Sequence, residues 1–298
     1  MPELTKENKP YAVGAIDFGG TKADVALASS NGQILAKSRL IIDHTSSAEQ
    51  IVQTAIQELK TLHTRFDVLD LSALAVASPG IVSDEGIELA PNVQGWNDLQ
   101  LPHILRNASG IDAVEVGNDV NFAAFAESQF GALRSVEVGA YIGLGTGVGA
   151  GIIISGRIIA GAHGAAGELG YLKNTDGRSV EDRAGGRAIE THFSSRTGLI
   201  ASASDILTLR DDPTAADAFD AISELVEAIA LTIDPHTIAF GGGLMEAGDF
   251  ILAAVRKRLQ HLPFELNLRP GDFIHDAVIR GLSYRAAHLA AETNTSCA

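Results

Sequence analysis

Two glycine-rich turns, each joining a pair of apolar strands, constrain the fold of this chain more than any other feature of its sequence. The first hairpin, at 12–40, contains the turn "DFGG", and the second, at 138–161, contains "GLGTG". Both have the apolar runs and turn residues of a β-hairpin. Because each hairpin opens one half of the 298-residue chain, we expect two related domains that face a cleft.

The elements between the hairpins favour an α/β fold. A helical period follows the first hairpin, with Ser46 or Ser47 as its N-cap, and another helix begins directly after Asp119. An apolar strand precedes each of the later glycine turns. Strands that alternate with helices are typical of α/β domains. The predicted strands of the first hairpin lie at 12–17, 23–29 and 33–40, and later helices are expected around 182–196, 213–233 and 246–260.

Composition excludes several classes of protein. The chain has 22 basic and 37 acidic residues, a net charge of −15, which argues against nucleic acid or an anionic membrane as the main partner. No apolar run reaches the roughly 18 residues that span a bilayer. The N-terminal residues lack the pattern of a signal peptide, so we expect a cytoplasmic protein. The single cysteine, Cys297, excludes an intrachain disulfide and a cysteine-rich zinc site.

Three glycine turns follow apolar strands and could hold phosphate. "DFGGTK" offers backbone amides, the Thr21 hydroxyl and the Lys22 cation to a phosphate, and Asp17 is the acid that the accompanying Mg²⁺ needs nearby. Alternatively, the two glycines form a plain hairpin turn. "GLGTGVGAG" fits the dinucleotide-binding fingerprint loosely, but it opens a strand instead of a helix, which excludes that function. No Gly-Lys pair exists for a Walker A loop. "FGGGL" at 240–244 could hold a phosphate or a flat base, or simply connect a strand to a helix.

Together these segments resemble the ROK family of sugar kinases, within the actin, hexokinase and Hsp70 ATPase superfamily. "DFGGTK" and "GLGTG" are similar to the two phosphate motifs of the family, and "SPGIV…PNVQGW" is similar to its sugar-side loop. "GNDVNFAAFAE" resembles the Asn-Asp catalytic motif, and "GAHGAAGELG" the most recognisable family signature. The resemblance runs in order from about residue 12 to residue 290 and implies two actin-like (ribonuclease-H-like) domains. Each would be a mixed five-stranded sheet flanked by helices, one formed by 1–118 plus 281–298 and the other by 119–280.

The resemblance implies ATP-dependent phosphorylation of a hexose hydroxyl, usually O6. Asp119 would be the general base that takes the proton of the attacking hydroxyl, unless it serves only as a helix N-cap. Asp17 would lie near Mg²⁺, through water. The residues implied to bind ATP and its phosphates are Asp17, Gly19, Gly20, Thr21, Lys22, Gly145, Thr146, Gly147, Gly241, Gly242 and Gly243.

The same resemblance implies a set of sugar ligands. Glu168 stands among glycines and alanines and would accept hydrogen bonds from sugar hydroxyls; otherwise it is a solvated loop carboxylate. Glu181 would be a further sugar ligand or, alternatively, an acidic residue in the first turn of a helix. The sugar ligands implied are Gly80, Asn92, Asn118, Asp119, Glu168 and Glu181.

The chain departs from the zinc-containing members of the family. Tyr171 stands where those members have histidine, and no cysteine cluster follows, so we expect no zinc site. These departures leave the identity of the phosphorylated sugar open. Glucose is the default, and mannose, an amino or N-acylamino hexose or a cyclitol are the alternatives. Polyphosphate is an alternative donor to ATP. A homodimer is the assembly implied.

Two functions other than a kinase are alternatives, and the resemblance implies the first of them, sugar-responsive repression. A sugar-responsive repressor would carry an N-terminal helix-turn-helix, but only 16 residues precede Asp17 and the chain is acidic. A catalytically silent sugar-binding or regulatory protein would have no need of the general base and the phosphate residues, which this sequence retains.

Overall fold

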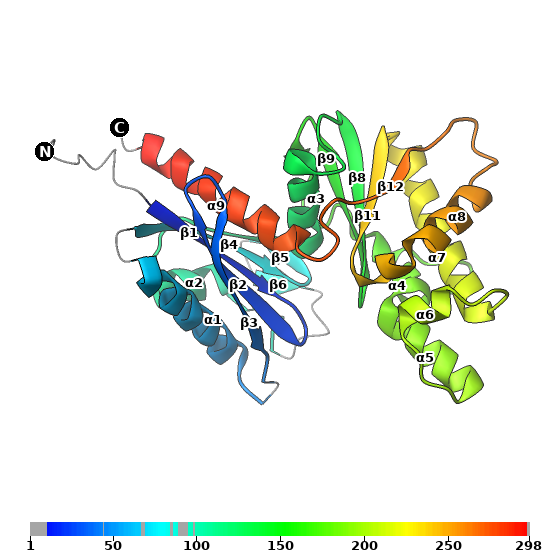
Figure 1. Ribbon diagram of the computed structural model, residues 1–298, viewed down its shortest axis with the longest axis horizontal. Helices are drawn as coiled ribbons and strands as arrows, with labels where there is room; N and C mark the ends of the chain where they lie inside the picture. The colour runs from blue at the N-terminus through cyan, green and yellow to red at the C-terminus, as the bar shows by residue number, and fades with distance from the viewer. Residues whose placement is uncertain are drawn as a thin grey trace, which may run out of the picture. The chain divides into compact units, whose positions relative to one another are not determined.

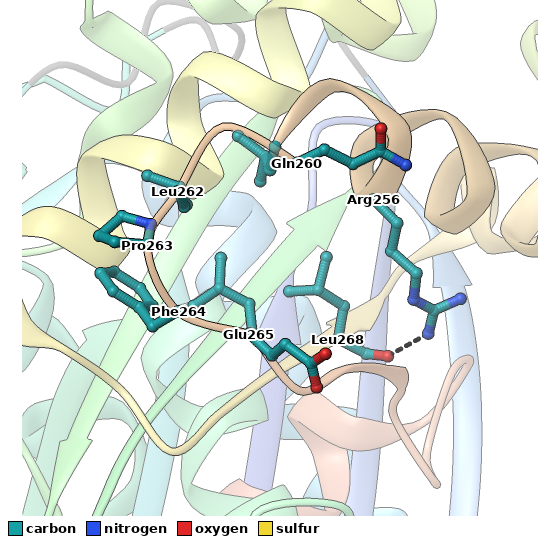
Figure 2. A pocket seen from close by; sticks show the side chains of 9 residues that line it. Arg256, Gln260, Leu262, Pro263, Phe264, Glu265 and Leu268 are labelled. Atoms are coloured by element: carbon teal, nitrogen blue, oxygen red, sulfur yellow. Dashed lines mark hydrogen bonds between the residues drawn. The ribbon is translucent and has the colours of Figure 1, made fainter.

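The computed structural model describes residues 11–43, 45–66, 69–83, 86–88, 95–97 and 99–296. These residues form two compact units. The first contains the described residues up to Phe122 together with those from Val278 onward, and the second contains Ala123–Ala277. Figure 1 shows the elements of both units. The domain boundaries expected from the sequence, at 118/119 and 280/281, stay a prediction.

The sheet of the first unit has five strands in the order β3-β2-β1-β4-β7. The first three strands form an antiparallel meander, while β4 and β7 run parallel to β1. A separate hairpin of β5 (Ile81–Ser83) and β6 (Gly86–Glu88) follows β4. The strands of the main sheet are β1 (Tyr11–Phe18), β2 (Lys22–Ser29), β3 (Ile34–Ile41), β4 (Asp70–Ser78) and β7 (Val114–Asn118).

Helices cover both faces of this sheet because β1 is apolar on both sides. Helices α1 (Ala48–His63) and α2 (Leu101–Ser109) pack on one face, and α9 (Ala277–Ser296) packs on the other (Figure 1). Gly14 faces α1, where a Cβ atom would lie only 2.5 Å from Leu59 Cδ2. The missing side chain therefore lets α1 approach the sheet closely.

Serine capping begins α1 as the sequence predicts. Ser47 is the N-cap, and its side chain forms a reciprocal capping box with Gln50. The 3₁₀ turn η2 (Thr64–Phe66) follows the helix. Of the two serines proposed as caps, Ser47 is confirmed.

The sheet of the second unit has the order β10-β9-β8-β11-β12. An antiparallel hairpin again leads into parallel strands, because β11 pairs in parallel with β8 and β12. Its strands are β8 (Val138–Leu144), β9 (Val148–Ile154), β10 (Arg157–Ile158), β11 (Thr237–Gly241) and β12 (Leu268–Pro270). Its helices between β10 and β12 are α4 (Val180–Ala184), α5 (Gly186–Thr197), α6 (Ala203–Leu207), α7 (Pro213–Ile233) and α8 (Gly248–Arg258), with the 3₁₀ turns η3 (Leu169–Tyr171) and η4 (Gly243–Ala247).

The predicted fold class is confirmed in the described residues. Each unit has a mixed five-stranded sheet flanked by helices. One helix differs from the prediction, since the segment expected around 182–196 forms two helices, α4 and α5. Gly185 separates them in an extended conformation, and a Cβ atom there would lie 3.0 Å from the Thr146 carbonyl oxygen. Among the helices of the described ranges, none is long and apolar enough to cross a membrane.

Glu127 is a buried carboxylate in α3 (Asp119–Phe130), the helix that leads from the first unit into the second. Its Oε2 accepts hydrogen bonds from the backbone N–H groups of Ala132 (2.7 Å) and Asp272 (3.1 Å), and its Oε1 accepts one from Phe273 (2.8 Å). Glu127 therefore fixes the end of α3 to the loop that leads into α9.

We expect Glu127→Gln to lower the free energy of unfolding by about 2–4 kcal/mol, because the new NH₂ group faces backbone donors that lose their acceptor in a buried place. Urea unfolding measures the difference. The matched control is Glu137→Gln, which alters an exposed carboxylate bonded to Ser155 Oγ at 2.6 Å. It should cost less than about 1 kcal/mol. Equal losses in the two variants would contradict the role given to Glu127.

Candidate active site

Two aspartates lie near the edge of the first sheet where its parallel strands end. β1, β4 and β7 run in the same direction, so their carboxyl ends lie along one edge, the place where α/β sheets bind ligands. Asp17 is the penultimate residue of β1, and Asp119 directly follows β7 as the first residue of α3. The two carboxyl groups are close enough for the charge of Asp119 to raise the pKa of Asp17.

The pKa of Asp17 is raised to about 7. Burial of the carboxyl group is the largest cause, and the negative charges of Asp119 and Asp24 raise the pKa further. Lys37 and Lys22 act in the opposite direction but do not outweigh these effects. A carboxyl group shifted this far by burial and by like charges is typical of a functional site.

Asp24 is the ionised neighbour of Asp17 on the adjacent strand. It pairs with Asp17 across β1 and β2 and with Arg39 across β2 and β3. Arg39 donates to both of its carboxylate oxygens, at 2.6 and 2.8 Å, and Lys37 Nζ lies 3.5 Å from Oδ2. Burial alone would raise the pKa of Asp24, but these cations hold that pKa below its usual value. Sequence reasoning missed Asp24, although a charged residue inside the apolar strand "KADVALAS" was a usable signal.

Asn118, instead of Asp119, is the N-terminal cap of α3. Its side-chain oxygen accepts hydrogen bonds from the N–H groups of Val120 and of the residue after it, at 2.8 and 3.3 Å. Asp119 Oδ1 also accepts from Val120 N–H at 2.8 Å. The Asn118 side-chain nitrogen donates to the Gly80 carbonyl oxygen at 3.4 Å. Three of the predicted sugar ligands therefore lie together in the first unit: Gly80, Asn118 and Asp119.

The first glycine turn joins β1 to β2 at the same edge. Gly19 N–H donates to the Lys22 carbonyl oxygen at 2.9 Å, which closes the turn around Gly20 and Thr21. The side chains of Thr21 and Lys22 are exposed. These four predicted phosphate ligands are thus neighbours of Asp17. The predicted sugar ligand Asn92 lies outside the described residues.

The second glycine turn joins β8 to β9. Gly145 N–H donates to the Gly147 carbonyl oxygen at 3.0 Å, and Thr146 lies between them. Helix α5 packs against this turn, since the N–H of its first residue, Gly186, donates to the Gly145 carbonyl oxygen at 2.8 Å. A Cβ atom on Gly145 would have no neighbour within 4 Å. The backbone at Gly145 is therefore open to the approach of a ligand.

The third glycine turn, Gly241–Gly243, lies beside the second. Gly241 pairs with Gly143 at the end of the parallel strands β11 and β8. Gly242 has φ +90°, and a Cβ atom there would lie 2.3 Å from the Leu144 carbonyl oxygen. The glycine therefore permits a backbone contact that any side chain would block. The structure brings together the two predicted phosphate-binding turns of the second unit.

Glu168, Tyr171 and Glu181 gather around the start of β9. Glu181 Oε2 accepts a hydrogen bond from Val148 N–H at 2.9 Å. The pKa of Tyr171 is raised, first by burial and then by the negative charges of Glu181 and Glu168. Glu181 is also an acid of the first turn of α4, as the alternative interpretation predicts. The structure thus places the two predicted sugar-binding glutamates near one phenol group.

Gly167, directly before Glu168, is a position where only glycine fits. It has φ +93°, and a Cβ atom there would lie only 1.9 Å from the Ala150 carbonyl oxygen. Its own carbonyl oxygen accepts from Ala150 N–H at 2.9 Å. The glycine therefore lets this segment dock backbone to backbone on β9, which fixes the position at which Glu168 follows.

In the part of the chain that the structure describes, no three His, Cys, Asp or Glu side chains are grouped so that they could hold a metal ion. A magnesium ion that accompanies a nucleotide needs only one or two carboxylates, because phosphates and water complete its shell. Asp17 and Asp119 are two neighbouring carboxyl groups at this edge of the sheet.

The model of the ROK family matches residues 13–274. The chain belongs to the ROK family. The predicted family is confirmed, and the match contains every glycine turn and every carboxylate described above.

Known proteins are similar to this ROK chain along most of its length. A glucokinase of Halalkalibacterium halodurans is 28% identical over 280 residues, which cover 82% of this chain and 84% of the relative. An N-acetylmannosamine kinase of Escherichia coli is 27% identical over 257 residues, covering 80% and 84%. The crystal structure of a ROK hexokinase from Thermus thermophilus superposes with a TM-score of 0.76 at 25% identity, covering 95% of this chain and 99% of that one.

We expect Asp17→Asn to stabilise the protein at neutral and alkaline pH. In the folded state Asp17 keeps its proton up to about pH 7, whereas the unfolded chain loses it near its ordinary pKa of 3.8. Wild-type stability therefore falls as pH rises between these values, and the asparagine variant avoids that loss.

Urea unfolding in the presence of a chelator measures this effect. The free energy of unfolding of the variant should exceed that of wild type by about 1–3 kcal/mol at pH 8. Below about pH 4 the two values should be equal. Asp176→Asn, on an exposed turn, is the control and should show no such trend. A stability gain that is independent of pH would contradict the shifted pKa.

Proposed function

We propose that this chain is a sugar kinase that transfers the γ-phosphoryl group of ATP to a hexose hydroxyl. The observation that carries the proposal is the proximity of Asp119 to Asp17 at the carboxyl edge of a sheet, in a chain of the ROK family. Relatives named glucokinase and N-acetylmannosamine kinase support a sugar as the acceptor.

Asp119 is the proposed general base. Its place at the start of α3, beside the Asn118 cap, fixes the backbone that carries it, and the Val120 N–H holds one of its oxygens. Its carboxylate would take the proton of the sugar hydroxyl as that oxygen attacks the γ-phosphorus atom. General bases of this kind accelerate reactions by about 10²–10⁴-fold.

The glycine turns are the proposed phosphate sites. Gly19, Gly20 and Gly145 offer a backbone without side chains, and Thr21 and Thr146 add hydroxyl donors. Phosphoryl transfer depends mainly on positioning and on neutralising charge. The turn Gly241–Gly243 would serve the adenosine side of the nucleotide, and Lys22 would supply a cation. Mg²⁺, when bound with the nucleotide near Asp17, would neutralise phosphate charge.

Glu168, Glu181, Asn118, Gly80 and Asn92 are the proposed sugar ligands. Carboxylates and side-chain amides suit hydroxyl groups because they accept and orient O–H donors. One carboxylate oxygen of Glu181 accepts a hydrogen bond from Val148 N–H in β9. Glu181 would therefore bind sugar while it keeps this hydrogen bond.

Glucose is the proposed substrate, with O6 as the phosphorylated oxygen. An N-acylamino hexose is the second candidate, because an N-acetylmannosamine kinase is nearly as similar to this chain as a glucokinase is. Mannose, a cyclitol and polyphosphate as donor are further alternatives that the test below includes. The proposed assembly is a homodimer, which light scattering tests.

The proposed activity is tested by release of ADP over a panel of sugars. Glucose, mannose, their N-acetylated amino derivatives and inositol are offered with ATP, and polyphosphate replaces ATP in a parallel series. We expect turnover with at least one hexose. Sugar binding without turnover for any acceptor or donor would contradict the kinase and favour a silent sugar-binding protein.

Asp119→Asn tests the general base. We expect kcat to fall by about 10²–10⁴-fold, because an amide cannot take the hydroxyl proton at neutral pH. The Kd of the sugar, measured by calorimetry, should change by less than about three-fold, since the amide keeps the shape and hydrogen-bonding reach of the carboxylate. Asp112→Asn, an exposed aspartate just before β7, should leave both constants unchanged. Near-normal turnover in Asp119→Asn would refute the assignment.

A further inference from the structure

Residues 172–179 form a short closed turn just before α4. The Asn174 side-chain oxygen accepts from the N–H groups of Asp176 and Arg178, each at 3.0 Å, and Asn174 N–H donates to the Arg178 carbonyl oxygen at 2.9 Å. Lys173 and Ser179 pair across the turn. The turn is thus internally bonded and would move as one piece together with the helix that it starts.

Helix α4 is joined to this turn by a capping box. Ser179 and Asp182 bond reciprocally, and Val180 N–H donates to the Leu172 carbonyl oxygen at 2.8 Å. The helix has only five residues, too few to be stable without contacts from elsewhere in the fold. Its position must therefore come from its neighbours.

Two arginines tie the turn and the helix to α7. Arg178 Nη1 lies 2.6 Å from Asp217 Oδ2, and Arg183 Nε lies 2.8 Å from Asp217 Oδ1. Arg183 Nη1 also lies 2.5 Å from Glu224 Oε2. Asp217 and Glu224 are seven residues apart, so they lie on one face of α7. A single carboxylate, Asp217, thus joins the turn through Arg178 and the helix through Arg183.

The arrangement is more than a surface ion pair, because Arg183 is buried, with 5% of its side chain exposed. Burial alone would raise the pKa of Asp217, but the hydrogen bonds and charges of Arg178 and Arg183 lower it below its usual value. Asp217 is therefore ionised at neutral pH. Loss of that charge would leave the buried guanidinium of Arg183 with Glu224 as its remaining anion.

Small shifts of α4 would be transmitted to Glu181, which the helix carries. A Cβ atom on Gly147 would lie 2.3 Å from Glu181 Oε2, and the same oxygen accepts a hydrogen bond from Val148 N–H at 2.9 Å. The Glu181 carboxylate thus lies directly against the backbone at 147–148, and its negative charge acts on Tyr171. The geometry leaves little room for Glu181 to compensate for a displaced helix.

We propose that Asp217 is a positioning residue of the sugar site: by binding Arg178 and Arg183 it fixes α4 and the turn before it, and so sets the position of Glu181. The inference rests on the proposed function, in which Glu181 binds sugar. The glycine turn at 145–147 has further support from the β8–β9 pairing, which does not involve α4. Asp217 should therefore affect sugar binding more than nucleotide binding.

Asp217→Asn tests this role. We expect the Kd and KM of the best-used hexose of the panel to rise about ten-fold or more, because a displaced ligand group costs binding steeply. The Kd of a non-hydrolysable ATP analogue should change less than about three-fold. Hydrogen exchange of the amides at 173–184 should become faster.

Asp220→Asn is the matched control on the same helix. Asp220 pairs with Arg258 Nε at 2.5 Å, so its carboxylate is bonded to α8. It should leave both Kd values and the exchange at 173–184 as in wild type. If Asp217→Asn does not fold, Arg178→Gln, which removes the more exposed arginine, should show a smaller shift of the same kind.

The outcomes separate the two proposals. A wild type that phosphorylates hexose, with Asp217→Asn or Arg178→Gln equal to the Asp220→Asn control in sugar Kd, would overturn the positioning role alone. Equal losses of sugar and nucleotide affinity in the Asp217 variant would also overturn it, because they would indicate general destabilisation. A wild type that neither binds nor phosphorylates any sugar would overturn the proposed function and this inference with it.

Discussion

The parallel pairing of β1, β4 and β7 is the constraint on which the first unit depends. It places the ends of three strands along one edge, and so brings Asp17, the turn at 19–22 and Asn118 together from distant parts of the sequence. The charge of Asp24, held by Arg39 on the next strand, then acts on Asp17 from within the sheet. The same backbone pairing therefore sets both the geometry and the electrostatics at this edge, and a change of register would disperse the carboxylates.

The second unit uses close backbone contact for the same purpose. Gly167 lies against the Ala150 carbonyl oxygen of β9, and Gly242 lies against the Leu144 carbonyl oxygen of β8. Both contacts are too close for any side chain. These contacts align the glycine turns and the segment that carries Glu168. Ion pairs complete the arrangement, because Arg178 and Arg183 fix α4 to Asp217. The segment at 172–184, which contains no cysteine, is thus held by hydrogen bonds and by charge.

Much of this could be predicted from local sequence. The two hairpins and the Ser47 cap follow from periodicity and turn residues, and the ordered motifs identified the family. Contacts between distant residues could not be predicted in this way. The Asp24–Arg39 pair depends on strand register, and the bonds of Asp217 span more than 30 residues, with no local signal. The sequence also placed a possible cap at Asp119, one residue away from the Asn118 that caps α3, because both residue types suit that position. The roles of the site residues and the domain boundaries stay predictions.

The central claim is that a phosphoryl group moves from a nucleotide to a sugar. The most direct measurement is mass spectrometry of the products after incubation with ATP, Mg²⁺ and the hexose that releases ADP fastest. The account predicts a hexose monophosphate formed in a one-to-one ratio with ADP, with the phosphate on O6 by ³¹P-coupled NMR. Formation of ADP and inorganic phosphate with unmodified sugar would contradict it.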